Sequence, residues 1–199
     1  MNREELKDEK RNKLLDASYY LFLKKGIRNT SIQDIVDEAG LGKGTFYFYF
    51  KDKYQVKNIL INQKANNLLL NAFHKLELQK NLLTLADKAI FTINELIDEL
   101  KNNPDLLKFV SKDLSYNIYR NAIDELYQNN EKTILDLFSN GLKENGDKIK
   151  HPEILLNMIL ELVCSTCYNS ILYSQPLPID DFKPFLYDNI RVLIENPNN

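Results

Sequence analysis

Apolar residues recur every three or four positions along most of this chain, which is the spacing that places them on one face of an α-helix. Near the N-terminus the pattern breaks at Gly26 and Gly40. Helices commonly end in a left-handed residue, a conformation that glycine adopts without steric cost. The sequence therefore predicts three successive helices here, over about 4–25, 31–39 and 42–48.

The helical pattern continues beyond residue 52, with breaks at prolines and at one Asn-Gly pair. The whole chain has only 6 glycines and 6 prolines, and it shows no internal repeat. We therefore expect an all-α fold with about nine helices. The six helices predicted after the first three span about 53–78, 82–101, 104–110, 114–144, 152–173 and 180–194.

The two short helices read as a helix-turn-helix motif over about 31–50. Thr30 and Ser31 are favoured N-cap residues, and Asp34 lies where a capping carboxylate belongs. A tight turn follows at Gly40. Two helices joined by a short turn that contains glycine are typical of DNA-binding proteins of this class.

The second short helix carries groups that suit a phosphate-lined groove. It offers a cation, a bare backbone patch and hydroxyls, which can bond to phosphates or base edges. Its aromatic residues could instead be core, and for Phe46 and Phe50, four positions apart, core packing is the better interpretation. The residues expected to face DNA are Lys43, Gly44, Thr45, Tyr47 and Tyr49.

The next predicted helix begins with a second candidate contact. Asp52 is a suitable N-cap, which places Lys53 in the first helical turn. A helix N-terminus and a lysine together form a phosphate clamp.

This segment resembles the DNA-binding domain of the TetR (tetracycline repressor) family of bacterial transcriptional regulators. The resemblance covers about the first 55 residues, and many positions agree at fixed offsets. One departure is Gly42, where the family usually has Ser or Thr. The matching residues are Leu14, Leu15, Asp16, Ala17, Leu21, Phe22, Lys25, Gly26, Thr30, Ile35, Ala39, Gly40, Lys43, Gly44, Thr45, Phe46, Tyr47, Tyr49, Phe50 and Lys53.

The resemblance implies a protein that places the helix over 42–48 in the major groove of double-stranded operator DNA. It implies an N-terminal three-helix helix-turn-helix DNA-binding domain over 1–52 and a C-terminal helical ligand-binding and dimerisation domain over 53–199. Base edges and phosphates would be contacted by Lys43, Thr45 and Tyr47, and the DNA backbone by Thr30, Tyr49 and Lys53.

Charge divides in the direction that this organisation requires. Residues 1–57 carry 12 Lys and Arg against 9 Asp and Glu, a net charge of about +3. The remainder carries 14 against 19, or about −5, which together give the −2 of the whole chain. A mildly basic head on an acidic body fits a DNA-binding domain joined to one that does not bind DNA.

The last two predicted helices are more apolar than packing on one side requires. The resemblance implies that they pair with a second subunit in a four-helix bundle across a two-fold axis, and a monomer with a wider core is the alternative. The residues expected at the dimer interface are Leu155, Ile159, Leu162, Phe182, Phe185, Leu186 and Leu193.

Aromatic residues scattered through the C-terminal helices would suit a small, largely apolar effector. An aromatic residue at helical spacing is nevertheless more often core than pocket, and a regulator with a protein partner or no ligand remains an alternative. The candidate ligand residues are Phe91, Phe109, Tyr116, Tyr119, Tyr127 and Tyr168.

Cys164 and Cys167 form a C-x-x-C pair, which raises a redox or metal interpretation. The sequence has no second such pair, and its only histidines are His74 and His151. Packing is therefore the favoured role, and we expect no metal and no cofactor. Motifs of hydrolases, zinc proteases and phosphate-binding loops are missing, so the sequence does not indicate an enzyme.

These observations predict a one-component transcriptional regulator, a repressor that acts as a homodimer. No apolar run approaches the roughly 20 residues that a membrane span needs. The charged N-terminus has no apolar signal core. We therefore expect a cytoplasmic protein.

Overall fold

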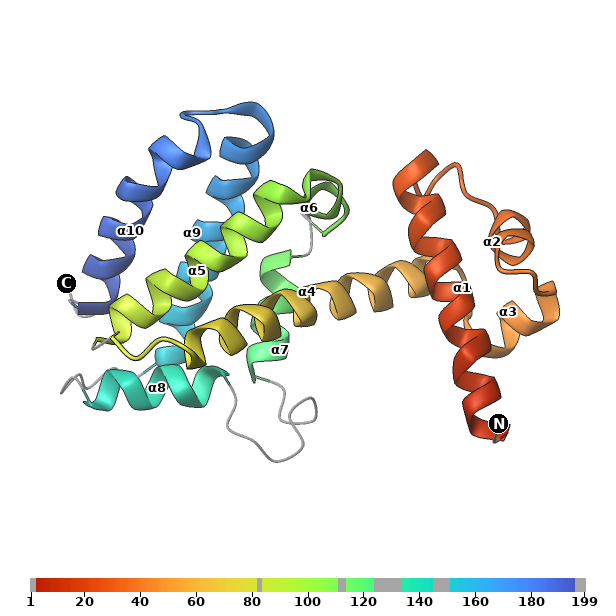
Figure 1. Ribbon diagram of the computed structural model, residues 1–199, viewed down its shortest axis with the longest axis horizontal. Coiled ribbons are helices and arrows are strands. Elements are labelled where there is room, and N and C mark those ends of the chain that lie inside the picture. The colour runs from red at the N-terminus through yellow and green to blue at the C-terminus, as the bar shows by residue number, and fades with distance from the viewer. Residues whose placement is uncertain (1–2, 82–83, 111–113, 124–133, 145–150, 196–199) are drawn as a thin grey trace. The chain divides into compact units, whose positions relative to one another are not determined.

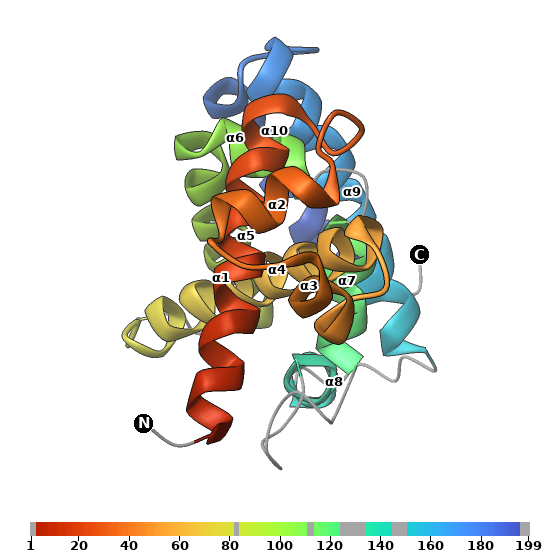
Figure 2. The ribbon, with the colours of Figure 1, turned by 90° about the vertical axis from the view of Figure 1, so that its right-hand side faces the viewer.

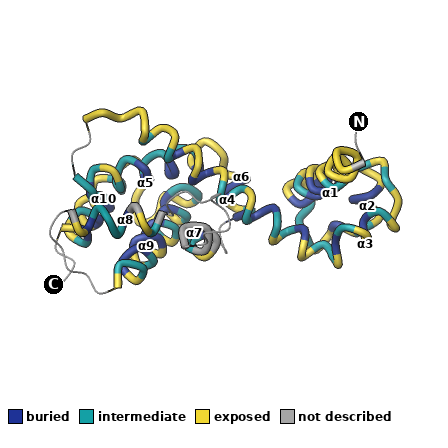
Figure 3. The backbone as a smooth tube through the Cα atoms, turned by 90° about the horizontal axis from the view of Figure 1, so that it is seen from below, coloured by how far each residue is buried: buried dark blue, intermediate teal, exposed yellow. Residues whose placement is uncertain are grey.

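The computed structural model describes residues 3–81, 84–110, 114–123, 134–144 and 151–195, which form ten helices and no strand (Figure 1). The predicted all-α fold is therefore confirmed. The chain divides into two compact units, Met1–Gln63 and Lys64–Asn199. Figure 3 shows that each unit has buried positions of its own.

The N-terminal unit contains α1 (Arg3–Lys25), α2 (Ile32–Glu38) and α3 (Lys43–Tyr49), followed by the first turns of α4 (Lys53–Glu77). In Figure 2 the two short helices lie beside the long α1. All four helices contribute buried apolar residues, and burial of one face of each helix favours packing of the helices against one another. The fully buried apolar residues of this unit include Leu14, Ile35, Val36, Phe46, Phe50, Val56 and Ile61.

The ends of these helices are set by the residues that the sequence indicated. Gly26 and Gly40 have φ angles of +79° and +64°, the left-handed region in which glycine is favoured. Ser31 caps α2, because its Oγ accepts from the Asp34 backbone N–H at 3.1 Å while the Asp34 carboxylate accepts from the Ser31 N–H at 2.7 Å. This reciprocal capping box fixes where α2 begins.

The start of α4 is capped in a similar way. The carboxylate of Asp52 accepts hydrogen bonds from the backbone N–H groups of Tyr54 and Gln55, at 2.9 and 2.8 Å. The predicted N-cap role of Asp52 is therefore confirmed. From this cap α4 runs as one helix of 25 residues, so it begins in the first unit and continues into the second.

The C-terminal unit is a bundle of helices around a single hydrophobic core. A helix predicted over 114–144 corresponds to α7 and α8, and the residues between these two helices lie outside the described part of the chain. The other predicted helices agree with the structure to within about three residues at their ends. The helices of this unit after α4 are α5 (Leu85–Asn102), α6 (Pro104–Val110), α7 (Leu114–Ile123), α8 (Ile134–Glu144), α9 (Pro152–Tyr173) and α10 (Ile179–Glu195).

Among the described helices, α9 is the one that passes a length and hydropathy test for a membrane span. It also supplies Leu155, Leu156, Ile159, Leu160 and Val163 to the core. The same apolar composition is typical of the central helix of a helical bundle.

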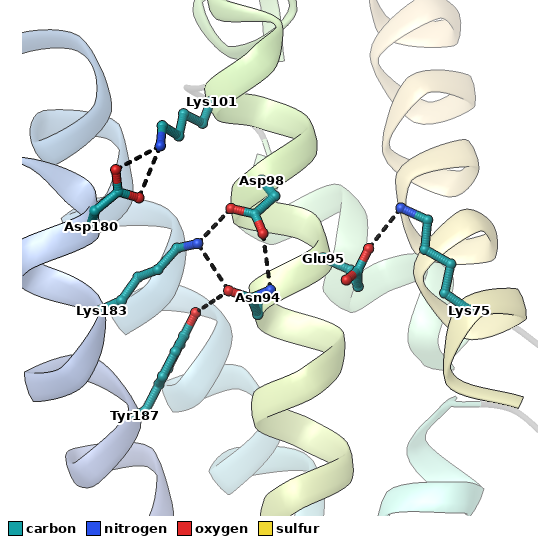
Figure 4. Close-up of polar contacts among 8 residues, drawn as sticks. All are labelled: Lys75, Asn94, Glu95, Asp98, Lys101, Asp180, Lys183 and Tyr187. Carbon is teal, nitrogen blue, oxygen red and sulfur yellow. Dashed lines mark hydrogen bonds and ion pairs between the residues drawn. The ribbon is translucent and has the colours of Figure 1, made fainter. Parts of the chain in front are cut away.

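Helices α5 and α10 pack antiparallel and are joined by polar contacts as well as apolar ones. Figure 4 shows Asn94 and Asp98 of α5 facing Lys183 and Tyr187 of α10. The Lys183 ammonium donates to Asn94 Oδ1 at 2.9 Å and to the Asp98 carboxylate, and the Tyr187 hydroxyl donates to Asn94 Oδ1 at 2.7 Å. Because each group has a partner in one alignment, these contacts fix the register of the two helices.

Candidate nucleic-acid interface

Helix α3 has one buried face and one open face. Phe46 and Phe50 are fully buried, with ring centroids 5.6 Å apart, and they hold the helix against the core. Gly44, Tyr47 and Phe48 are exposed at relative positions i, i+3 and i+4, so they share the opposite face. Lys43 is exposed beside them. We call Lys43, Gly44, Tyr47 and Phe48 the open face of α3.

Two of the predicted DNA contacts, Thr45 and Tyr49, lie at the margin of the open face and are half-buried. The Tyr49 ring packs edge-on against the ring of Phe48, with centroids 4.9 Å apart. Both side chains therefore sit between the core and the exposed surface, with part of each still accessible.

Gly44 is not required by packing within the chain. A Cβ atom added at this position would meet nothing within 4 Å, and the same holds at Gly42. A missing side chain in the first turn of α3 leaves bare backbone, which permits another molecule to approach closely. Gly42 caps α3 without a side-chain hydrogen bond, in agreement with the departure from the family pattern.

Thr30 differs from its expected role as a contact to the DNA backbone. Its side chain is fully buried, and its hydroxyl donates to the carbonyl oxygen of Gly26 at 2.8 Å. Its backbone N–H donates to the carbonyl oxygen of Ile27 at 3.3 Å. A buried hydroxyl with a partner inside the protein has no path to a phosphate, so we assign Thr30 to the loop between α1 and α2 instead.

Lys53 links the start of α4 to the same loop. Its ammonium donates to the carbonyl oxygens of Thr30 at 2.8 Å and of Arg28 at 3.2 Å, and it lies 5.7 Å from the ring centroid of Tyr54. An ammonium has three N–H donors, so one remains for a phosphate. The N-terminus of α4 itself is already occupied, because the Asp52 carboxylate accepts from its first free N–H groups.

An ion pair joins the end of α1 to the start of α2. Lys25 Nζ lies 2.8 Å from Asp34 Oδ2, and the same carboxylate accepts from the Ser31 backbone and hydroxyl. The hydrogen bond from Lys25, followed by those from Ser31, holds the pKa of Asp34 well below its usual range. These contacts favour the charged carboxylate and thereby fix α2, the helix against which α3 packs.

Two exposed residues of this region were not singled out from the sequence. Phe48 belongs to the open face of α3, and Lys51 is an exposed cation just after that helix. The signal for Phe48 was available, because it lies four residues after Gly44 and one after Tyr47. For Lys51, the sequence offered no signal other than its positive charge.

Five of the six candidate ligand residues lie in the described part of the chain. Phe91, Phe109, Tyr119 and Tyr168 are half-buried and come from four different helices. Tyr116 is 62% exposed, so it does not line an interior cavity. Tyr127 lies outside the described residues.

The predicted interface residues of α9 and α10 separate into buried and accessible ones. Leu155, Ile159 and Leu186 are buried in the core of the chain itself, which removes them from a surface for a second subunit. Leu162, Phe182 and Leu193 are half-buried, and Phe185 is 60% exposed. The apolar side chains that remain accessible on these helices include Ile154, Met158, Phe185 and Val192.

The cysteine pair has the properties of packed thiols. Burial raises the pKa of both Cys164 and Cys167 to about 12, so both are protonated near neutral pH. A protonated thiol is a poor nucleophile and a poor metal ligand. Within the described residues, no group of three His, Cys, Asp or Glu side chains could hold a metal ion.

Known proteins that are similar to this chain are regulators with a helix-turn-helix. Residues 14–56 match the profile of bacterial regulatory proteins of the tetR family. The chain is 23% identical to the HTH-type regulator YvkB of Bacillus subtilis over 74% of its own length and 77% of YvkB. It is 21% identical to the HTH-type transcriptional repressor KstR2 of Mycolicibacterium smegmatis over 84% of its length and 80% of KstR2. Three other curated regulators are matched over less than half of their own length.

The fold is shared with solved regulators over nearly the whole chain. FadR from Bacillus subtilis, solved in complex with stearoyl-CoA, superposes with a TM-score of 0.63 at 16% identity, covering 95% of this chain and all of FadR. The matched proteins are named as regulators and not as enzymes. Residues 14–56 therefore form a helix-turn-helix domain of the kind found in the tetR family of bacterial regulatory proteins, and the relatives indicate a DNA-binding transcriptional regulator.

Proposed function

We propose that this protein is a homodimeric repressor, released from its operator by a small, largely apolar ligand bound in the C-terminal unit. The observation that carries the DNA-binding part is the open face of α3. That face combines the cation of Lys43, the bare backbone of Gly44 and the phenol of Tyr47 on the accessible side of a helix held from behind by Phe46 and Phe50.

On operator DNA, α3 lies in the major groove. Lys43 and Tyr47 contact phosphates and base edges, and Thr45 and Tyr49 reach the groove from the margin of the open face. Lys53 contacts a phosphate with its third N–H donor while its other two hold the loop of Arg28 and Thr30. The positive charge of the N-terminal region adds a contribution that does not depend on sequence.

The homodimer uses the accessible apolar side chains of α9 and α10. Ile154 and Met158 lie four positions apart on α9, and Phe185 and Val192 seven apart on α10, so each pair lies on one side of its helix. Exposed apolar side chains in such a pattern mark a contact surface. A two-fold dimer presents two copies of α3, which fits a palindromic operator with half-sites one or more helical turns apart.

The ligand acts through α4, which is the covalent link between the two units. An apolar ligand that favours one packing of the C-terminal helices changes the position of α4 and with it the spacing of the two α3 helices. FadR, which shares the fold, was solved with stearoyl-CoA, which joins an apolar acyl chain to a charged coenzyme A head group. The alternative is a protein partner in place of a ligand. Because a repressor binds chromosomal DNA, the proposed function also places the protein in the bacterial cytoplasm.

Selection of bound fragments from sheared genomic DNA tests the proposed function. We expect enrichment of a small number of fragments, each with a palindromic footprint whose half-sites are separated by one or more helical turns. The variant Lys43→Gln with Tyr47→Ala should lose this enrichment while keeping the helical content of the parent. Absence of enrichment with the parent protein would contradict operator binding.

A further inference from the structure

The most accessible apolar side chain of the N-terminal unit belongs to the open face of α3. Phe48 is 68% exposed, and among the large apolar side chains of the described residues only Leu78 is more exposed, at 77%. Tyr47, beside Phe48, is 57% exposed, so two aromatic rings lie together on this side of α3, and contiguous exposed apolar surface marks an interaction site.

The fold holds Phe48 outward. Phe46 lies two residues before it and Phe50 two residues after it, and both are fully buried, so the rotation of α3 is fixed by the core. Phe48 therefore cannot turn inward without removing those two rings from their positions. Its ring also packs edge-on against Tyr49 at 4.9 Å, which limits the directions that it can take.

The neighbours of Phe48 leave its outer side free. Gly44, one turn earlier on the same face, has no side chain, and a Cβ atom there would meet nothing within 4 Å. Tyr47 is the adjacent exposed residue, and its ring packs against buried Phe46 with centroids 5.6 Å apart. The phenyl ring therefore lies beside bare backbone at Gly44. Without a side chain there, this face of α3 can approach the floor of the major groove closely.

The chemistry of a phenyl ring selects one feature of the major groove. Phe has no donor and no acceptor, so it cannot bond to a phosphate or to the polar edge of a base. The 5-methyl group of thymine is the apolar group that base pairs present in the major groove. We propose that Phe48 is a specificity-determining residue that packs against a thymine 5-methyl group in each operator half-site.

This inference rests on the proposed operator binding and adds to it. Lys43 and Tyr47 offer polar groups, whereas the Phe48 side chain is wholly apolar. With Phe48, the operator also needs a thymine at a defined position, and cytosine or uracil there lacks the methyl group. The contact supplies discrimination between sequences, because it has no counterpart on the DNA backbone.

Single replacements of thymine by deoxyuridine in the selected operator test the proposal, since they remove the methyl group and leave all hydrogen-bonding groups in place. At one symmetry-related position per half-site, we expect the affinity of the parent protein to fall about fourfold per replaced thymine, the change that corresponds to one buried methyl group at about 0.8 kcal/mol. Phe48→Ala should bind thymine and deoxyuridine operators equally at that position.

Two controls separate this contact from a general loss of binding. Tyr47→Ala should weaken binding but keep the thymine preference, because Phe48 is intact. Phe48→Ala should keep the melting temperature and helical content of the parent, because the side chain is exposed. A thymine preference that persists at every position in Phe48→Ala would overturn the proposal, as would a parent protein indifferent to every replacement. A parent protein that binds the operator but is indifferent to every replacement would contradict only the role of Phe48. A parent protein that binds no DNA would contradict both the role of Phe48 and operator binding.

Discussion

The ammonium of Lys25, in the last turn of α1, lies 2.8 Å from the carboxylate of Asp34, in the first turn of α2. The same carboxylate closes the capping box with Ser31. One charged group therefore both starts α2 and joins it to α1. Because α3 packs against α2, this contact contributes to the position of the whole helix-turn-helix.

Acid should loosen α2 before it affects the rest of the unit. The folded-state pKa of Asp34 is depressed, so its contribution to stability is present above the unfolded pKa of about 4. That contribution is lost progressively as the pH falls below this value towards the folded pKa. Hydrogen exchange of the α2 amides measures the effect, and we expect their protection to decrease as the pH falls below about 4.

Asp34→Asn is the matched variant for that measurement. It removes the titrating charge and the ion pair with Lys25 but keeps a side chain of the same shape. Its α2 amides should exchange faster than those of the parent at neutral pH and should show a weaker pH dependence below about 4. An identical acid response in parent and variant would show that another group is responsible.

Lys53→Gln should have two separable effects. Loss of the ammonium removes the hydrogen bonds to the carbonyl oxygens of Arg28 and Thr30, so the melting temperature of the N-terminal unit should fall. Loss of the proposed phosphate contact should lower the slope of log K against log salt by about one for all DNA sequences. Lys80→Gln, an exposed lysine of the other unit, changes the net charge equally and should do neither. A lower melting temperature with an unchanged slope would restrict Lys53 to its structural role.

Lys183→Met should destabilise the C-terminal unit. The Lys183 side chain is only 14% exposed and donates to Asn94 and Asp98 across the α5–α10 contact (Figure 4). Its removal leaves the Asp98 carboxylate without its cation and takes one of two donors from Asn94 Oδ1, at a cost of about 2 kcal/mol in the free energy of unfolding. Chemical denaturation followed by circular dichroism measures this change.

Lys101→Met is the control for the same helix pair. Lys101 also joins α5 to α10 through Asp180, but both side chains are largely exposed, so its removal should cost less. The double variant Lys183→Met with Asp98→Leu should recover part of the stability lost in Lys183→Met, since it removes the unpaired carboxylate. Equal losses for Lys101→Met and Lys183→Met would contradict the importance assigned to burial.

Met158→Glu should weaken the proposed homodimer. Met158 is exposed on α9, close in the helical repeat to Ile154, so a carboxylate there would be buried without a partner in a dimer contact. We expect the variant to sediment as a monomer at concentrations at which the parent is a dimer. Leu78→Glu introduces the same charge at an exposed apolar residue that belongs to neither α9 nor α10, and it should leave the sedimenting mass unchanged.

The sequence predicted the elements of this fold well because the signals for them are local. Glycines at Gly26 and Gly40, the capping pair Ser31 and Asp34, and the N-cap Asp52 act within one or two helical turns. Their consequences therefore follow from neighbouring residues alone, and the helix boundaries of the N-terminal unit agree with prediction.

What the sequence left open depends on which neighbour covers each face. Periodicity placed Leu155, Ile159 and Leu186 on apolar faces, but the core of the same chain buries them. Thr30 matches the family at its position, yet its hydroxyl bonds inward to Gly26. Phe48 stands within a run of aromatic residues, and the structure shows that it is exposed while Phe46 and Phe50 are buried. Such assignments require the rotation of each helix, which is a tertiary property.

The proposed function requires that α3 binds a specific operator as part of a dimer. The most direct measurement is a titration of the purified protein with the DNA that flanks its own gene, at two salt concentrations, beside an unrelated fragment of equal length. We expect tight binding to the flanking DNA, with two subunits for each palindromic site and weaker binding at the higher salt. No binding to either fragment at low salt would contradict it.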